Sequence, residues 1–313
     1  MLFQTRNSSA QLTLITSAYI TRGLMVGWNI HLCIQSLQYP MSNYNIRRSA
    51  KSGSDWSEQE MLAYRITIDH LTPLQFFGHD PNTKPYPFSE HLLSTENPTI
   101  AHDISDEEYE FLAFLQQALE PDVLEPAIDE FGRQLLKAGG FQERGTLLRT
   151  RVAIPITICG DSTRLAQTDV CLVGIDTGVL LIVQTRQSSQ DPVAQLMAAI
   201  ATYQANNKLR ASRSLSPLLT MNIPCITMSG TQSEFYIVPV TQQLSQAVIT
   251  AQCPRAETVA MHCTLPPPPK GSMPGLRDPE YRRTVLKYYS SFRSLAKRNW
   301  TPMLDGLFRT QHT

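Results

Sequence analysis

The residues with the clearest chemical potential lie on neighbouring predicted strands. Asp169 falls in a short predicted strand, residues 168–173, and Thr185 and Gln187 lie two positions apart at the end of the next, residues 179–184. Side chains two apart on a strand share one face. A carboxylate on the first of these strands and Glu-x-Lys on the second would bind Mg²⁺ through oxygen atoms and activate a water for phosphodiester cleavage. Here the pair is a threonine and a glutamine, which is a poor magnesium site.

Other patterns for catalysis or metal binding are missing from the sequence. The six cysteines form no CxxC pair, and the seven histidines form no HxH or HExxH pair. No GxSxG, Walker A or GxGxxG motif occurs. We therefore expect no cofactor, except Mg²⁺ if the strand residues still form a nuclease site.

Charge is distributed unevenly along the 313 residues. Residues 1–54 contain five basic residues and no acid, whereas residues 55–313 contain 22 basic and 27 acidic residues, a net charge of −5. A negative body argues against a generic nucleic-acid binder. The longest apolar stretches fall short of the roughly 18 residues that a membrane span needs. We expect an intracellular protein of the cytoplasm or nucleus, without membrane contact.

Residues 1–54 have the composition of a leader. They contain Arg, Ser and Thr without acids, as mitochondrial transit peptides do, which makes a mitochondrial protein the alternative. A disordered tail, or a true start at Met41, explains the same composition. On each interpretation the first 50 residues contribute little to the fold.

The body predicts the order helix-helix-β-β-β-helix-β-β-helix. Residues 72–103 are rich in Pro, His, Asn and Ser, so we expect an irregular surface segment over residues 55–104. A single domain over 105–300 and a tail over 301–313 follow. The apolar periodicity predicts helices over residues 105–119, 123–138, 191–207 and 278–295, and strands over residues 147–158, 168–173, 179–184, 225–228 and 235–240. The strand over 179–184 is apolar on both faces, which favours the sheet centre. The predicted class is α/β (α+β), with a small mixed central sheet flanked by helices.

Several blocks of this body resemble a known superfamily. They are residues 129–133, 139–141, 166–172, 180–187, 192–207, 226–231 and 235–240. Together they are similar to the PD-(D/E)XK nuclease-like superfamily, and to a fungal branch of it with a degenerate active-site motif. The resemblance covers roughly residues 106–297 and implies a restriction-endonuclease-like α-β-β-β-α-β core.

The resemblance also assigns roles to particular residues. It implies that Asp169 is the surviving metal-site acid and that Glu130 is a helix-borne remnant acid, so both are weak metal candidates. Fungal relatives commonly read Gln-Glu-Asp-Lys where this chain reads Gln-Thr-Arg-Gln over 184–187. Thr185 thus replaces the second carboxylate and Gln187 replaces the lysine. Gln195 is expected as a polar residue over the former site.

Three functions follow from these residues. The first is a catalytically impaired PD-(D/E)XK-like fold that acts as a binding or interaction module for an unknown protein or nucleic acid. The second is an active Mg²⁺-dependent nuclease that uses Asp169, Glu130 and a relocated third ligand. The third is a nucleic-acid-binding protein without hydrolysis, which would contact phosphates through arginines at 144, 149, 151 and 186.

Overall fold

A computed structural model describes most of the body of the protein. The described residues are 48–51, 56–83, 89–95, 104–120, 122–186, 193–268 and 275–307. All of them belong to one compact unit, Asn45–Thr313. The predictions for residues 1–47, which include Met41, and for Gln187 lie outside the described residues.

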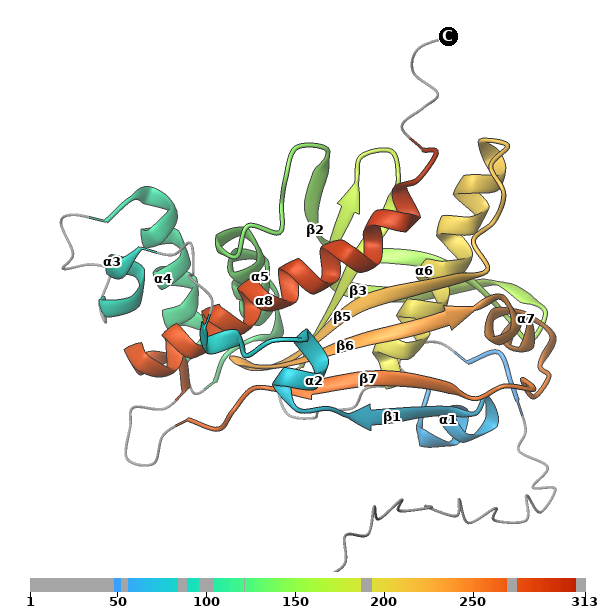
Figure 1. The fold of residues 1–313 in the computed structure, drawn as a ribbon, viewed down its shortest axis with the longest axis horizontal. Helices are drawn as coiled ribbons and strands as arrows, with labels where there is room; N and C mark the ends of the chain where they lie inside the picture. The colour runs from blue at the N-terminus through green and yellow to red at the C-terminus, as the bar shows by residue number, and fades with distance from the viewer. Residues whose placement is uncertain are drawn as a thin grey trace, which may run out of the picture. The chain divides into compact units, whose positions relative to one another are not determined.

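The centre of the unit is a seven-stranded mixed sheet (Figure 1). Its strand order is β1-β7-β6-β5-β4-β3-β2. The β1–β7 and β4–β5 pairs are parallel and the other pairs are antiparallel. The strands are β1 (Ile66–His70), β2 (Thr146–Ile158), β3 (Asp161–Gly174), β4 (Gly178–Arg186), β5 (Thr220–Ser229), β6 (Gln232–Thr241) and β7 (Thr258–Thr264). The mixed sheet with flanking helices confirms the predicted class, although the sheet has two more strands than the sequence indicates.

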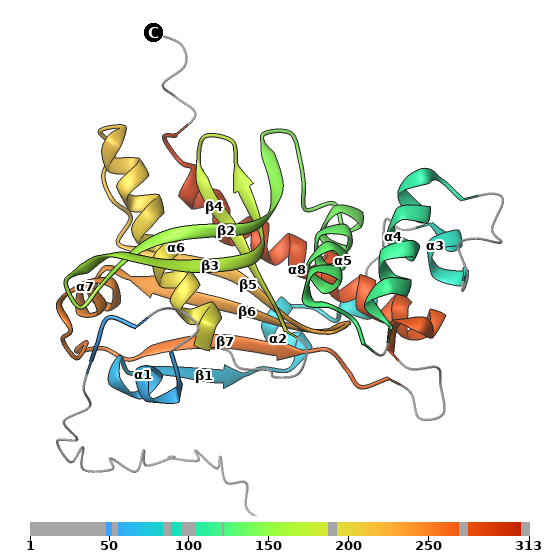
Figure 2. The ribbon, with the colours of Figure 1, turned by 180° about the vertical axis from the view of Figure 1, so that it is seen from behind.

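Strand β4 is an interior strand, as its composition predicts. Leu180 to Val183 are fully buried on both faces of the sheet. Helices α5 (Glu125–Ala138) and α8 (Pro279–Leu304) lie over one face in Figure 1, and α6 (Val193–Ser212) lies over the other in Figure 2. The long strands β2 and β3 curl towards α6, so the first turns of α6 are buried almost all round. Helix α4 (Asp106–Ala118) packs beside α5 and begins with the predicted capping box of Ser105 and Glu108.

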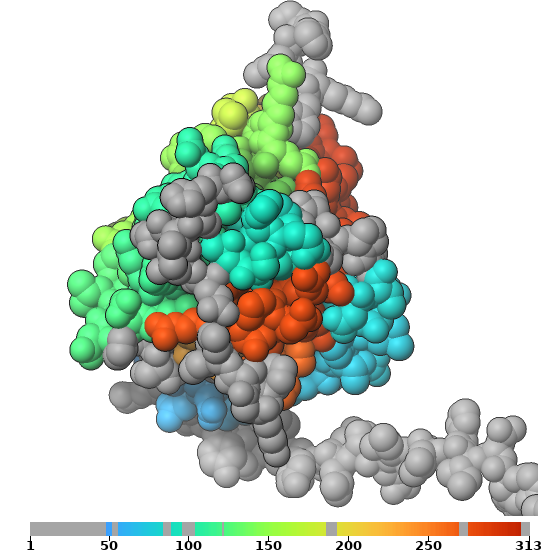
Figure 3. All heavy atoms as spheres, turned by 90° about the vertical axis from the view of Figure 1, so that its left-hand side faces the viewer, coloured from blue at the N-terminus to red at the C-terminus, as the bar shows by residue number. Residues whose placement is uncertain are grey.

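The segment 55–104 is not the irregular surface covering that its composition suggests. It contains α1 (Glu58–Ala63), the edge strand β1, α2 (Pro73–Phe77), a 3₁₀ turn (Pro81–Thr83) and α3 (Glu90–Ser94). Phe76 and Phe77 of α2 are buried, and Phe76 stacks on Phe292 of α8. In Figure 3, α2 (cyan) and α3 (teal) border the first turns of α8 (orange). Helices of five or six residues are too short to show a helical period, and only Ile66 of β1 is buried, so the composition of this segment was misleading.

A buried arginine explains how α3 is held in place. The guanidinium of Arg282, in α8, donates to the backbone carbonyls of Leu92 at 2.8 Å and Thr95 at 2.9 Å. Each of these carbonyls lies at the end of α3, where intrahelical donors are missing. The contact joins parts of the chain that are about 190 residues apart, so no local sequence pattern reports it.

Three further predictions needed correction. The sequence did not indicate α7 (Gln242–Thr250) or β7, and the predicted domain end at residue 300 falls inside α8, which continues to Leu304. Trp300 and Met303 are buried, which keeps the last turns of α8 on the core. A short 3₁₀ turn, Gly275–Arg277, precedes α8. Within the described residues, we find no helix with the length and apolar content of a membrane span.

Candidate functional site

Strands β3 and β4 separate at Asp169. Their backbone pairing runs from the Gly174–Gly178 end to Val170 and Val183 and stops there. Beyond that point, side chains replace the ladder. Oδ2 of Asp169 accepts a 2.7 Å hydrogen bond from the backbone N–H of Thr185, and Nε2 of Gln184 donates to the Gln167 carbonyl at 2.8 Å. The split places a carboxylate between two strands.

Thr185 connects two acids at this split. Its backbone N–H binds Asp169, and its hydroxyl donates to Oδ1 of Asp129, which is 4% exposed. Asp169 and Thr185 therefore lie together, as the resemblance implies. The second acid comes from α5 and not from the strand.

Helix α5 can bring Asp129 this close because it lies directly on the sheet. Its apolar stripe includes Ile128, Phe131 and Leu135, all fully buried. Gly132, one turn after Asp129, has no side chain to hold the helix away. A Cβ atom at this position would lie 3.0 Å from the sulfur of Met228 on β5. The close approach aims Asp129 at Thr185.

Glu130 does not take part in this cluster. Its carboxylate is bound by the Nε of Arg133 at 2.8 Å, an i,i+3 ion pair on the outer side of α5. Asp129, and not the predicted Glu130, is therefore the acid of this helix that contacts Thr185. The sequence did contain a signal for Asp129, because it lies beside Ile128 and one turn before Gly132 on the buried side of the helix.

A cation reaches the cluster from the edge strand β2. The β2–β3 register places Arg151 opposite Asp169, between the Thr150–Val170 and Val152–Thr168 pairs, and interrupts the ladder there. Arg151 has a left-handed backbone, with φ of 53°, which is uncommon for a residue with a side chain. Its Nε lies 3.5 Å from Oδ2 of Asp129, and its side chain is 56% exposed.

Burial makes Asp169 a weaker acid than usual. Burial raises the pKa of Asp169 from 3.8 to about 6, and the negative charges of Asp129 and Glu125 add to the rise. The N–H of Thr185 opposes it by stabilising the charged form. A perturbed carboxyl in a polar cluster is a feature of functional sites, although structural clusters can also produce it.

Gln195 is buried near the same region from the α6 side. It is 1% exposed, and among the described residues neither its amide oxygen nor its amide nitrogen has a hydrogen-bond partner. Asn206, three turns later on the same stripe, binds the backbone N–H and carbonyl of Val179. Gln195 therefore lies on the side of α6 that faces the sheet, and α6 covers the face opposite α5.

The described acids do not fit a Mg²⁺ ion as they stand. Both oxygens of Asp129 are engaged, by the hydroxyl of Thr185 and by Arg151, and Oδ2 of Asp169 is engaged by the N–H of Thr185. Mg²⁺ needs near-octahedral oxygen ligands. The two carboxylates leave one oxygen, Oδ1 of Asp169, and the neighbouring guanidinium would repel a divalent cation.

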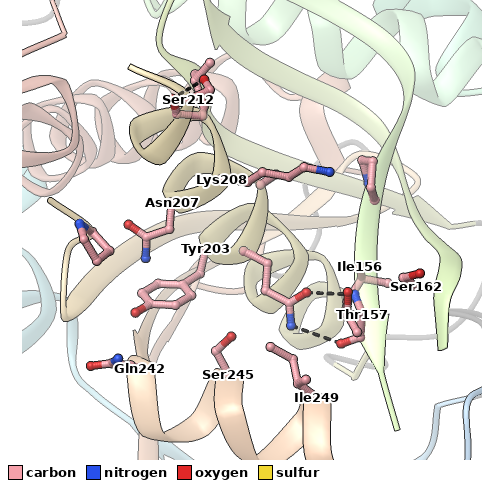
Figure 4. Close-up of a pocket in the computed structure, with 15 residues that line it drawn as sticks. Ile156, Thr157, Ser162, Tyr203, Asn207, Lys208, Ser212, Gln242, Ser245 and Ile249 are labelled. Carbon is pink, nitrogen blue, oxygen red and sulfur yellow. Dashed lines mark hydrogen bonds between the residues drawn. The ribbon is translucent and has the colours of Figure 1, made fainter. Parts of the chain in front are cut away.

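A separate groove lies between α6, β2 and α7 (Figure 4). It has a volume of about 650 Å³, and Lys208 is the one charged residue among the described residues that line it. Gln204 lines the groove, and its side-chain amide hydrogen-bonds the N–H and the carbonyl of Thr157 on β2, at 2.8 and 3.1 Å. This amide occupies backbone groups that an edge strand would otherwise offer to another strand. None of the predicted site residues lines the groove.

Comparison of the sequence with models of protein families and with curated proteins finds no match.

Proposed function

We propose that this chain is a PD-(D/E)XK-like domain that has lost nuclease chemistry and acts as a binding or interaction module, a pseudoenzyme. The observation that carries the proposal is the position of Thr185. A hydroxyl stands where the resemblance expects a metal-binding carboxylate and donates to Asp129, while the backbone N–H of the same residue donates to Asp169. The acids that remain are satisfied by the protein itself.

The arrangement supports a cluster that links neighbouring elements rather than one that turns over a substrate. Arg151 neutralises one acid, and Thr185 bridges the two, so the cluster joins α5, β2, β3 and β4. A domain that has lost catalysis can keep the surface around Asp129, Asp169 and Thr185. We propose that this surface binds a partner, either a protein or a nucleic acid, inside the cell.

Two measurements on the purified full chain test this proposal. Calorimetric titration with Mg²⁺ and with Mn²⁺ is expected to show no saturable binding at millimolar metal. DNA affinity, measured by fluorescence anisotropy at several salt concentrations, separates the two kinds of partner. A steep linear fall of log affinity with log salt supports phosphate contacts through the exposed Arg144, Arg149 and Arg151. Tight saturable binding of the metal that Asp169→Asn abolishes would contradict the proposal.

One observation favours a second candidate, a residual metal-dependent nuclease. Asp129 and Asp169 lie on either side of a single residue, so the fold still brings two carboxylates together. Asp129 would then serve in place of the missing strand carboxylate, after Arg151 moves away. This candidate requires that Asp129→Asn and Asp169→Asn both abolish metal binding, whereas Glu130→Gln leaves it unchanged.

A further inference from the structure

A second group of polar side chains on β6, β7 and β1 is linked by hydrogen bonds into a row, which we call the polar chain. Strands β4 and β5 separate it from Asp169. Oε2 of Glu234 accepts a 2.6 Å hydrogen bond from the hydroxyl of Tyr236 and lies 3.2 Å from Nε2 of His262. Nδ1 of His262 lies 2.7 Å from Nδ1 of His70. Glu234, Tyr236 and His262 are buried, whereas His70 is exposed at the sheet edge. The chain thus runs from the core to the surface.

The strand register builds this chain. Tyr236 pairs with His262, and His262 pairs with His70, so all three side chains share one face of the sheet. The rings of Tyr236 and His262 are stacked at 4.3 Å, which fixes the plane of the imidazole. His262 therefore has a defined orientation between a carboxylate and a second imidazole.

The hydrogen-bond partners determine which atom of this polar chain carries each proton. Burial alone would raise the pKa of Glu234, but hydrogen bonds from His262 and Tyr236 outweigh it and lower the pKa, so the group is a carboxylate at neutral pH. A carboxylate accepts only, so Nε2 of His262 carries a proton and donates to it. In the neutral imidazole, Nδ1 of His262 is then an acceptor, and Nδ1 of His70 must be the donor. That leaves the lone pair of His70 on Nε2, for which no partner occurs among the residues that the structure describes.

We propose that His70 is an activated nucleophile, with Glu234 and His262 as positioning residues, and that its Nε2 accepts an acyl group from an activated ester or anhydride. The lone pair of Nε2 forms a bond to the carbonyl carbon, and the bond from that carbon to the leaving oxygen breaks. The proton on Nδ1 of His70 passes to Nδ1 of His262, whose new positive charge is stabilised by Glu234. A hydrogen-bonded acid, base and nucleophile in series is the general arrangement of nucleophilic catalysis. This inference does not depend on the cluster at Asp169.

Diethyl pyrocarbonate is a suitable probe, because it transfers an ethoxycarbonyl group to imidazole nitrogen and releases ethyl carbonate. The modification rate of each histidine is measured by mass spectrometry on the full chain at neutral pH. His91 is exposed on α3 and does not belong to this hydrogen-bonded group, so it is the internal control. We expect His70 to react at least about ten times faster than His91, since positioned proton transfer contributes roughly 10²–10⁴-fold in enzymes. In Glu234→Gln, His70 should react at the rate of His91, and the rate of His91 should not change. Equal rates in the native protein, or an unchanged His70 rate in the variant, would overturn the proposal.

A second measurement needs no substitution and therefore covers the case in which Glu234→Gln does not fold. Nitrogen-15 NMR of the native protein identifies which nitrogen of each imidazole is protonated. The proposal requires a proton on Nδ1 and none on Nε2 of His70. A proton on Nε2 of His70 would show that His262 holds both of its own protons, and the nucleophile would then be absent.

Discussion

Replacing Asp169 by asparagine is expected to stabilise the protein at neutral pH. A carboxyl whose pKa is raised to about 6 by burial binds its proton more tightly in the folded chain than in the unfolded chain. Between pH 3.8 and about 6 the folded state holds the extra proton, so the free energy of unfolding falls as the pH rises through this window. Above it, the protein carries the full cost of a buried charge. Asparagine removes the charge, and its side-chain oxygen can still accept the hydrogen bond from Thr185.

The magnitude follows from the difference between the two pKa values. A pKa of Asp169 that is higher by about two in the folded chain corresponds to about 3 kcal/mol of unfolding free energy at pH 7. Asp169 is partly open to solvent, which reduces the expected gain to about 1–2 kcal/mol. The gain should disappear at pH 4, where Asp169 is protonated in the folded protein.

Urea unfolding of the native chain and of Asp169→Asn, at pH values from 4 to 8, measures this difference. Asp161→Asn is a matched control on the same strand, because the hydrogen bond from the side chain of Thr163 lowers the pKa of Asp161 to about 2. That control should not become more stable at neutral pH. A destabilised Asp169→Asn at pH 8, or a gain that does not depend on pH, would refute the view that Asp169 is a buried carboxylate kept at a cost in stability.

Three further predictions concern the motif, the core and the leader. The double substitution Thr185→Glu with Gln187→Lys should raise Mg²⁺ affinity in calorimetry, because it adds a carboxylate beside Asp169; unchanged binding would mean that the matched positions are wrong. Ile182→Asp should prevent cooperative folding, since an unpaired carboxylate in a fully buried strand costs several kcal/mol out of a total of roughly 5–15; a soluble variant with a sharp melting transition would contradict the interior position of β4. A chain that starts at Met41 should have the melting temperature of the full chain, and a large loss would show that the leader packs on the core.

The sequence predicted the parts of the fold that have a long, regular period. The capping box at Ser105, the helix start at Asp278 and the doubly buried strand β4 are all present as expected. The segment 55–104 was misjudged because its elements are short and depend on distant partners. The carbonyls of α3 are satisfied by Arg282, and β1 pairs only with β7, almost 200 residues away.

The candidate site shows the same division between local and distant information. Asp169 and Thr185 lie together, as their predicted places on adjacent strands indicate. Glu130 and Asp129 are neighbours on a helix and differ by about 100° in direction, and the close packing of Gly132 against Met228 of β5 turns Asp129 towards the sheet. The role of Arg151 depends on a left-handed residue in β2, which the local sequence does not indicate.

The proposed loss of nuclease chemistry is tested most directly by a cleavage assay. The purified full chain is incubated with labelled single- and double-stranded DNA in the presence of Mg²⁺ or Mn²⁺, next to Asp169→Asn and Asp129→Asn. We expect all three proteins to leave the DNA intact at the background rate, because Thr185 and Arg151 occupy the carboxylates that a metal would need. Metal-dependent cleavage by the native chain that either substitution abolishes would contradict the proposal and establish the nuclease in its place.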